Sequence, residues 1–468
     1  MILLSSAGPL ISTVVGSSIL LLPWSISSLG YLGGSIVYVS LLSITVFTLY
    51  CIVNVCDRLN LYSFKTLATA IFGQRFAFSF CLCVVFYCLL LLPGYILLIG
   101  DFSSSLISQL GFHELVPVRW NLSLLFSVLF LIPLSSLPSL SALRYVSSLT
   151  LLTVVILSVY IGSAAIASLF GYPFIELPDP KPTHHLFTFS SDSWTAFSII
   201  ALSFACQLNL PTTFKELPGR SLITIKKIVN IAMFFVGILF AFIAFGGYYL
   251  YGYEVDPNIL LSLPQSSFVV KLASCLFLIV VLIAYPVIFA GFRAIVTDLY
   301  FDWKLNIPRK RKTKRVGFDS VIRSLSPEPL LDHTDSSYSL TLSPDYSLNS
   351  SVSVELSFPV NELTGEESRN DLQAFNEVKF NNWQRISLAV ITVGINFAFS
   401  LFTSNFEAVV GLASSSFGVF IVFFFPCLTF WKVFRNTISR VQIVLCLVCF
   451  SIGTVLFVLG SWSSIKSL

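Results

Sequence analysis

Long runs of apolar residues constrain this chain more than any other feature. Several of them exceed the roughly 18 residues that a helix needs to cross a bilayer. Hydrophobic residues make up 56% of the 468 residues and charged residues only 11%, where a soluble domain carries about 25% charged residues. Short alternating segments, which are typical of a membrane β-barrel, do not occur in the sequence. The sequence therefore predicts an all-α polytopic membrane protein.

The pattern predicts eleven transmembrane helices, of which the first and the sixth are interrupted. Their expected limits are Leu3–Leu29, Leu32–Val55, Phe76–Gly100, Asn121–Leu137, Tyr145–Ser168, Trp194–Leu210, Ile228–Tyr251, Phe268–Ala290, Ile386–Phe402, Ala408–Phe430 and Val441–Gly460. In terms of domains, residues 1–302 should hold helices 1–8 and residues 383–468 should hold helices 9–11. Met1 leads straight into apolar sequence without a basic region, so we expect no cleaved signal peptide.

Lys and Arg residues predict the orientation of the helices in the membrane. With the N-terminus in the cytosol, the inner loops hold 11 Lys and Arg and the outer segments hold 4, before the long loop is counted. This is the asymmetry that the positive-inside rule requires. The segment 303–382 begins with a basic run and continues with Ser-, Pro- and acid-rich sequence. We expect it to be a disordered cytosolic loop, because it cannot bury enough apolar surface to fold.

The first span contains the stretch V-V-G-S-S-I-L-L-L-P-W, whose composition weakens a helix. Gly16 has a poor helix propensity, Ser17 and Ser18 can bond backbone groups locally, and Pro23 lacks an amide donor. Unpaired backbone groups are costly in hydrocarbon, so a broken helix persists only where it lines a cavity inside the protein. A simple proline kink is the alternative interpretation.

The sixth span is interrupted in the same way, by Gln207, Asn209 and Pro211. Two interrupted helices at corresponding places in two halves indicate an inverted-repeat transporter. Spans 1–5 would form one repeat and spans 6–10 the other, with the eleventh outside the repeat. The pair of interruptions favours a binding site over two separate kinks.

The two breaks predict a site for a zwitterion, because a half-helix N-terminus attracts a carboxylate and a half-helix C-terminus attracts a cation. The start of the outer half-helix would hold the carboxylate, and carbonyl groups near residues 13–15 would hold the ammonium group. The sixth span would supply the opposite wall. The predicted substrate-binding residues are Thr13, Val14, Val15, Gly16, Ser17, Ser18, Ile19, Phe204, Ala205, Cys206 and Gln207.

The middle of every predicted span is free of Asp, Glu, Lys, Arg and His. A buried carboxylate or histidine relay for proton coupling is therefore not visible. Asp101, Lys271, Arg293 and Glu407 fall near span ends, where we interpret them as interfacial anchors. The sequence shows no nucleophile–base pair, metal-ligand cluster or phosphate-binding loop, so we expect neither an enzyme nor a bound cofactor.

Four stretches of this sequence carry a resemblance to a known family. They are G-S-S-I-L-L-L-P-W-S-I-S-S-L-G from Gly16, L-I-P-L-S-S-L-P-S-L-S-A-L-R-Y-V-S from Leu131, F-A-C-Q-L-N-L-P-T-T-F-K-E-L-P-G-R-S from Phe204 and Y-P-V-I-F-A-G-F-R-A from Tyr285. They resemble the amino acid/auxin permease family, and within it the sodium-coupled neutral amino acid transporter branch, whose lysosomal member is also similar in the first span. The resemblance covers the chain apart from the long loop. It implies eleven spans, a five-plus-five inverted repeat and alternating access around a central amino-acid site.

Three departures from the family pattern concern the coupling ion. Ser12 stands where the family often has Asn, Ala284 where sodium-coupled members have a hydroxyl residue, and Gln207 where the family has His. The candidate Na⁺ site near Val15 and Ala284 would lose a ligand. The coupling ion therefore stays open between Na⁺ and H⁺.

We predict a secondary active transporter, and the uncharged Gln207, Asn209 and serine pair favour neutral amino acids. An amino-acid sensor that signals through cytosolic partners of the loop 303–382 is the alternative, and a facilitative channel is a third possibility. The expected partners are a free amino acid and membrane lipids, with no nucleic acid. Both a lysosomal or vacuolar membrane and the plasma membrane are consistent with the sequence.

Overall fold

The computed structural model describes residues 10–11, 14, 16–109, 119–137, 146–175, 182–217, 221–306, 381–403 and 405–468, with the backbone alone at 17, 146, 147 and 301–306. These residues belong to one compact unit, Met1–Arg309 together with Asn381–Leu468. The predicted loop lies outside the described residues from 307 to 380. The predicted site residues Thr13 and Val15 also lie outside them.

Every regular element in the described part of the chain is helical. The first half contains η1 (Ser17–Leu21), α2 (Leu22–Ser27), α3 (Gly30–Leu59), α4 (Phe64–Phe72), α5 (Gln74–Gln109), α6 (Arg119–Phe126), η3 (Ser127–Leu131), α7 (Ile132–Ser136) and α8 (Val146–Leu169). The middle contains α9 (Asp192–Ser203), η5 (Gln207–Asn209), α10 (Leu210–Glu216), α11 (Leu222–Tyr251), η7 (Gly252–Glu254), α12 (Ile259–Ser262) and α13 (Phe268–Asn306). The last part contains α16 (Asn382–Phe402), α17 (Phe406–Ala413), η8 (Ser414–Gly418), η9 (Phe420–Phe424), α18 (Phe425–Val433), α19 (Arg440–Val455), η10 (Leu456–Gly460) and α20 (Ser461–Ser467).

Ten helical stretches within the described residues are long and apolar enough to cross a membrane. They correspond to the second to eleventh predicted spans, so the prediction of an all-α polytopic membrane protein is confirmed. The predicted first span is described only in part, as a shorter apolar helix, Ser18–Ser27. The count of eleven and the inverted repeat therefore stay predictions.

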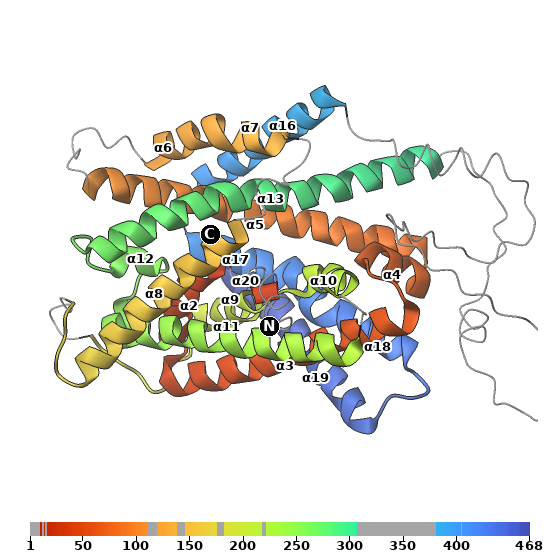
Figure 1. Ribbon diagram of the computed structural model, residues 1–468, viewed down its shortest axis with the longest axis horizontal. Coiled ribbons are helices and arrows are strands. Elements are labelled where there is room, and N and C mark those ends of the chain that lie inside the picture. The colour runs from red at the N-terminus through yellow and green to blue at the C-terminus, as the bar shows by residue number, and fades with distance from the viewer. Residues whose placement is uncertain are drawn as a thin grey trace, which may run out of the picture. The chain divides into compact units, whose positions relative to one another are not determined.

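The short helices of the two interrupted spans lie among the long ones (Figure 1). Helix α2 contacts α9, α3 and α11, while α5 packs against α13, α17 and α6. A Cβ atom added to Gly247 of α11 would lie 2.7 Å from Cγ of Pro23 in α2. Glycine at this position therefore lets α11 pack closely on the first interrupted span.

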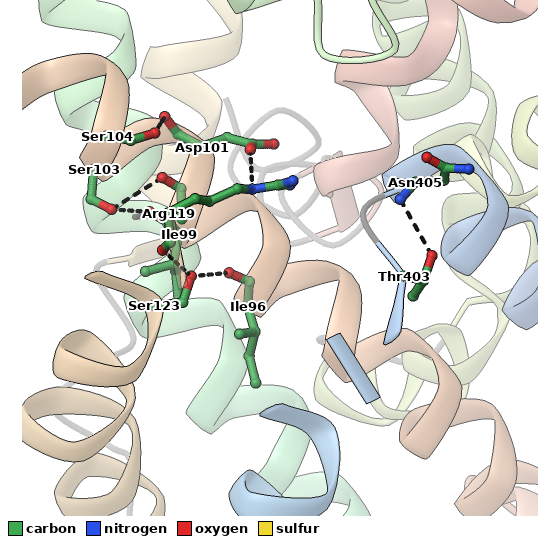
Figure 2. A network of polar contacts seen from close by, with 10 residues as sticks. Ile96, Ile99, Asp101, Ser103, Ser104, Arg119, Ser123, Thr403 and Asn405 are labelled. Atoms are coloured by element: carbon green, nitrogen blue, oxygen red, sulfur yellow. Dashed lines mark hydrogen bonds and ion pairs between the residues drawn. The ribbon is translucent and has the colours of Figure 1, made fainter. Parts of the chain in front are cut away.

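Helix α5 continues to Gln109, well beyond the predicted end at Gly100. Asp101 therefore lies inside a helix, where its Oδ1 is 2.7 Å from Nε of Arg119 at the start of α6. Figure 2 shows this pair beside Ser123, whose hydroxyl donates to the Arg119 carbonyl at 3.1 Å and contacts the Ile96 carbonyl at 3.4 Å. The Asp101 side chain is only 12% exposed. A neighbouring helix thus supplies its counter-charge, which the sequence did not reveal, and its interpretation as an interfacial anchor stays a prediction.

Candidate functional site

The first interrupted span changes direction at Gly16. This residue has an extended backbone, with φ −120° and ψ −171°, and no side chain caps the turn that follows it. The Ile19 amide donates to the Gly16 carbonyl at 3.5 Å, which starts the 3₁₀ turn η1. Pro23 comes later, in the first turn of α2, where its missing amide costs no hydrogen bond. The break therefore lies at Gly16, and the proline belongs to the first turn of the regular helix.

The sixth span is interrupted between Ser203, the last residue of α9, and Gln207, the first of η5. The Asn209 amide donates to the Cys206 carbonyl at 3.2 Å, which closes the short turn. Pro211 then lies in the first turn of α10. The two spans thus share one local design: an irregular segment, a 3₁₀ turn and a helix with proline in its first turn.

A cavity of about 640 Å³ lies between the two breaks. Its walls come from both interrupted spans, from α4, α5 and α13, and from the span that contains η8 and η9. At one end it reaches Lys65 of α4 and Asp298 of α13, whose Nζ and Oδ2 atoms are 3.3 Å apart. These side chains are 32% and 58% exposed. The cavity therefore runs from the breaks to an exposed end of the protein.

The structure places most of the described site predictions on this cavity. Those that line it are Val14, Gly16, Ser18, Ala205, Cys206 and Gln207. Ile19 and Phe204 are fully buried and are not among its lining residues. The Phe204 ring packs instead against Tyr38, edge to face at 5.2 Å between centroids.

The remaining predictions are not placed on the cavity. Thr13, Val15 and the side chain of Ser17 lie outside the described residues. Ala284, predicted near a cation site, is half-buried in α13 and is not one of the residues that line the cavity.

Gln207 makes a polar contact with α3 that the sequence pattern did not predict. Its Nε2 donates to Oγ1 of Thr48 at 3.2 Å, and the Thr48 hydroxyl donates to the Thr45 carbonyl at 2.9 Å. All three residues are fully buried. Oε1 of Gln207 and Oγ1 of Thr45 have no hydrogen-bond partner among the described residues. Buried polar atoms are rarely left unpaired, so the contact between α3 and the sixth span is incompletely hydrogen-bonded within the described residues.

Sequence reasoning missed the short helix α4, which lies in a segment interpreted as a loop. Phe64 and Lys65 of this helix line the cavity, as do Tyr87 and Tyr95 of α5. A signal for α4 was present, since the buried residues of this helix are Leu67, Ala68 and Ile71, an i, i+1, i+4 spacing typical of an amphipathic helix. The aromatic positions of α5 carried no such signal, because they lie within a uniformly apolar run.

These features define an all-α membrane protein with a cavity between two interrupted helices. The family described as transmembrane amino acid transporter protein matches residues 3–466, so the chain belongs to this family. The resemblance to the amino acid/auxin permeases, stated above from four motifs, is confirmed.

Similarity to individual proteins is low but extends over much of the chain. The chain is 25% identical to sodium-coupled neutral amino acid transporter 7 of Xenopus laevis, over 51% of this chain and 50% of that protein. It is 26% identical to vacuolar amino acid transporter 7 of Saccharomyces cerevisiae, over 63% of this chain and 59% of that protein. The chain thus spans about half to three fifths of these relatives. Both are named as transporters, in agreement with the prediction that the chain is not an enzyme.

Among solved structures, the chain is similar to MhsT, crystallised in complex with L-phenylalanine. The TM-score is 0.46 and the sequence identity 11%, over 99% of this chain and 98% of that chain.

Proposed function

We propose that the chain is a secondary active transporter that moves neutral amino acids by alternating access. The observation that carries this proposal is the cavity of about 640 Å³, which residues of both interrupted spans line. Its volume lies in the range of small-molecule sites, roughly 300–1,000 Å³. Family membership supports the same substrate class, because the family is named for amino acid transport.

The broken backbone would bind the two charged ends of the amino acid. The amides of Ser17 and Ser18 precede the hydrogen bond from Ile19 to Gly16 that starts η1, and they would donate to a carboxylate. Carbonyl groups of residues 13–15, before the break, would accept from the ammonium group. The segment Phe204–Gln207 would form the opposite wall, with Ala205, Cys206 and Gln207 on the cavity side.

An opening of the cavity at one end supports alternating access. The cavity reaches the exposed Lys65–Asp298 pair there. The charge asymmetry of the loops would place the Lys65 end and the N-terminus in the cytosol. The cavity would then represent a state open to the cytosol.

Two relatives guide the proposals on coupling and location. One is named as sodium-coupled and one as vacuolar, so we propose a coupling ion, Na⁺ or H⁺, and residence in a lysosomal or vacuolar membrane. The candidate Na⁺ site near Val15 and Ala284 would rest on backbone carbonyls, because alanine offers no side-chain oxygen. We also propose that the loop 303–382 binds cytosolic partners.

Uptake by the purified protein in proteoliposomes tests the proposed function. A panel of amino acids is compared at two pH values, with sodium present or replaced by choline. We expect saturable uptake of neutral amino acids that increases with one of the two ion gradients. Absence of flux for every amino acid under every gradient would contradict transport, and binding without flux would favour the sensor.

A further inference from the structure

A second hollow, of about 460 Å³, lies between α8 and α11. Its lining residues fall within 162–169 of α8 and 238–249 of α11, together with Tyr31 at the start of α3, and none of them lines the cavity between the two breaks. We propose that this hollow, the α8–α11 groove, binds a sterol from the leaflet opposite the cytosol. The inference does not depend on the proposed transport function.

The α8–α11 groove opens toward lipid. Both helices are long and apolar enough to cross a membrane. Several large apolar side chains that line the groove are nevertheless 43–66% exposed, namely Ile166, Leu169, Ile238 and Phe242. On a membrane-spanning helix, an exposed apolar patch meets hydrocarbon instead of water. The occupant of the groove is therefore a lipid.

The groove lies within one leaflet. Lys226 and Lys227, near the start of α11, mark the end of this helix that the positive-inside rule predicts to be cytosolic. The lining residues of α11 run from Ile238 to Tyr249, close to the opposite end. At about 1.5 Å per residue this stretch is roughly 16 Å long, about half of the 30 Å hydrocarbon core. The groove thus matches the depth of the leaflet opposite the cytosol.

Small residues create the hollow. A Cβ added to Gly162 would lie 2.9 Å from Cδ1 of Phe242, and one added to Gly246 would lie 3.1 Å from Cγ2 of Ile161, so α8 and α11 approach closely here. Ala241, on the groove wall of α11, is only half-buried. The short side chain at this position leaves space beside the neighbouring aromatic rings.

The polar side chains of the groove lie at its outer end. Among the described residues that line it, only Tyr31 and Tyr249 have a polar side chain, and none is charged. The rings of both contact His184, in the segment before α9. Tyrosines favour the membrane–water interface. This end therefore suits the single hydroxyl of a neutral lipid, and it offers no Lys or Arg to pair with a phosphate head group.

A lipid that stays in this groove must pack better there than bulk lipid does. Acyl chains are as apolar as the groove wall, so apolar character alone gives no preference within the bilayer. A flexible chain also loses conformational freedom when a fixed hollow holds it, whereas a fused ring system has little freedom to lose. A rigid apolar body with one hydroxyl, which is the chemistry of a sterol, satisfies both conditions.

Photolabelling of the full chain in phosphatidylcholine vesicles tests the site. Two cholesterol analogues carry a diazirine, one on the steroid ring and one on the tail, and the adducts are mapped by mass spectrometry. We expect the ring probe to label 245–249 and the tail probe to label 238–242. Excess cholesterol should abolish both adducts. Oleyl alcohol, which has a hydroxyl and a flexible chain, should not.

A matched pair of variants places the same ring inside and outside the groove. Ala241→Phe fills the hollow and should lower labelling at least about tenfold. Ala398→Phe adds the ring at an exposed position of α16, which does not line the groove, and should leave labelling unchanged.

The inference fails if the adducts map outside α8 and α11, or if cholesterol does not reduce them. Equal competition by oleyl alcohol would overturn the preference for a sterol. Unchanged labelling in Ala241→Phe, with thermal unfolding showing that the variant is folded, would also overturn it. If this variant does not fold, the mapped adducts and the competition in the wild-type protein still decide. None of these measurements requires flux, so a failure of the proposed function is detected separately.

Discussion

The α5–α6 cluster, formed by Asp101, Arg119 and Ser123, and the cavity between the two interrupted spans both place polar groups inside an apolar helical protein. In the cluster the charges are paired across 2.7 Å, and Ser123 bonds to a backbone carbonyl on each helix. At the cavity, Gln207 keeps its Oε1 without a partner among the described residues.

The difference teaches which polar groups hold the helices together and which are available for a ligand. Pairing of Asp101 and Arg119 joins two helices that pack closely at Gly100, where an added Cβ would lie 2.5 Å from Oγ of Ser123. For Gly16 at the cavity, no atom of the described residues lies within 4 Å of an added Cβ. Substitutions should therefore affect stability at the cluster and binding at the cavity.

The largest effect on stability is expected from Arg119→Ala. It would leave the carboxylate of Asp101 largely buried without its partner, which typically costs about 3–5 kcal/mol. Thermal unfolding in detergent measures the loss. Ser123→Ala, which removes a neutral hydroxyl at the same crossing, should cost only about 1 kcal/mol. A melting temperature of Arg119→Ala equal to that of wild type would remove the distinction between the two regions.

The converse substitution is Gly16→Leu, which should abolish most uptake while leaving stability unchanged. The backbone φ of −120° suits any L-residue, and the leucine side chain would fill the part of the cavity beside the first break. We expect at least about a tenfold loss of substrate affinity, which corresponds to about 1.4 kcal/mol. Gly16→Ala is the matched control and should retain uptake. Binding that survives in Gly16→Leu would show that the site lies elsewhere.

A smaller effect is expected at the mouth of the cavity, where Lys65 and Asp298 form an exposed ion pair. Exposed pairs contribute about 0–1 kcal/mol and weaken with salt. A double-mutant cycle of Lys65→Ala and Asp298→Ala should therefore yield a coupling energy in this range that disappears at high ionic strength. A coupling energy of several kcal/mol that persists at high ionic strength would instead show that this pair behaves like the buried Asp101–Arg119 pair.

The smallest effect concerns His184, which lies outside both regions and the predicted spans. Burial, together with the neighbouring His185, lowers the pKa of His184 below its usual 6.5. The unfolded chain then binds the proton more readily, so stability should fall slightly as pH drops from about 6.5 toward the lower folded-state pKa.

Urea unfolding at a series of pH values measures this dependence. His184→Phe keeps a ring beside Tyr31 and Tyr249, whose centroids lie 5.7 and 5.9 Å from that of His184, and should flatten the profile. An identical pH profile in this variant would show that the dependence comes from other groups, such as those of the cluster or the cavity mouth.

The position of the breaks was predictable because backbone propensities are local. Glycine, paired serines and proline weaken a helix wherever they stand, and both interruptions lie where the sequence placed them. The structural role of the prolines was harder to predict from the sequence. Pro23 and Pro211 look like helix breakers in sequence, yet each lies in the first turn of a new helix.

The environment of each site residue was not predictable in the same way. Phe204 and Gln207 belong to one short interrupted segment, and both were predicted to line the site. The structure buries Phe204 against Tyr38 and places Gln207 on the cavity wall. The direction of a side chain in an irregular segment depends on how the surrounding helices are arranged. A sequence pattern does not contain that arrangement.

By itself, the sequence determined the all-α membrane class, ten of the spans and the location of the two interruptions, because hydrophobic length and backbone propensity act along the chain. Only the tertiary structure decided that α4 and the α5 tyrosines line the cavity, that Arg119 pairs with Asp101, and that the Gln207 amide contacts Thr48. These contacts join residues far apart in sequence. They depend on which helix faces meet, and a uniformly apolar pattern does not encode that choice.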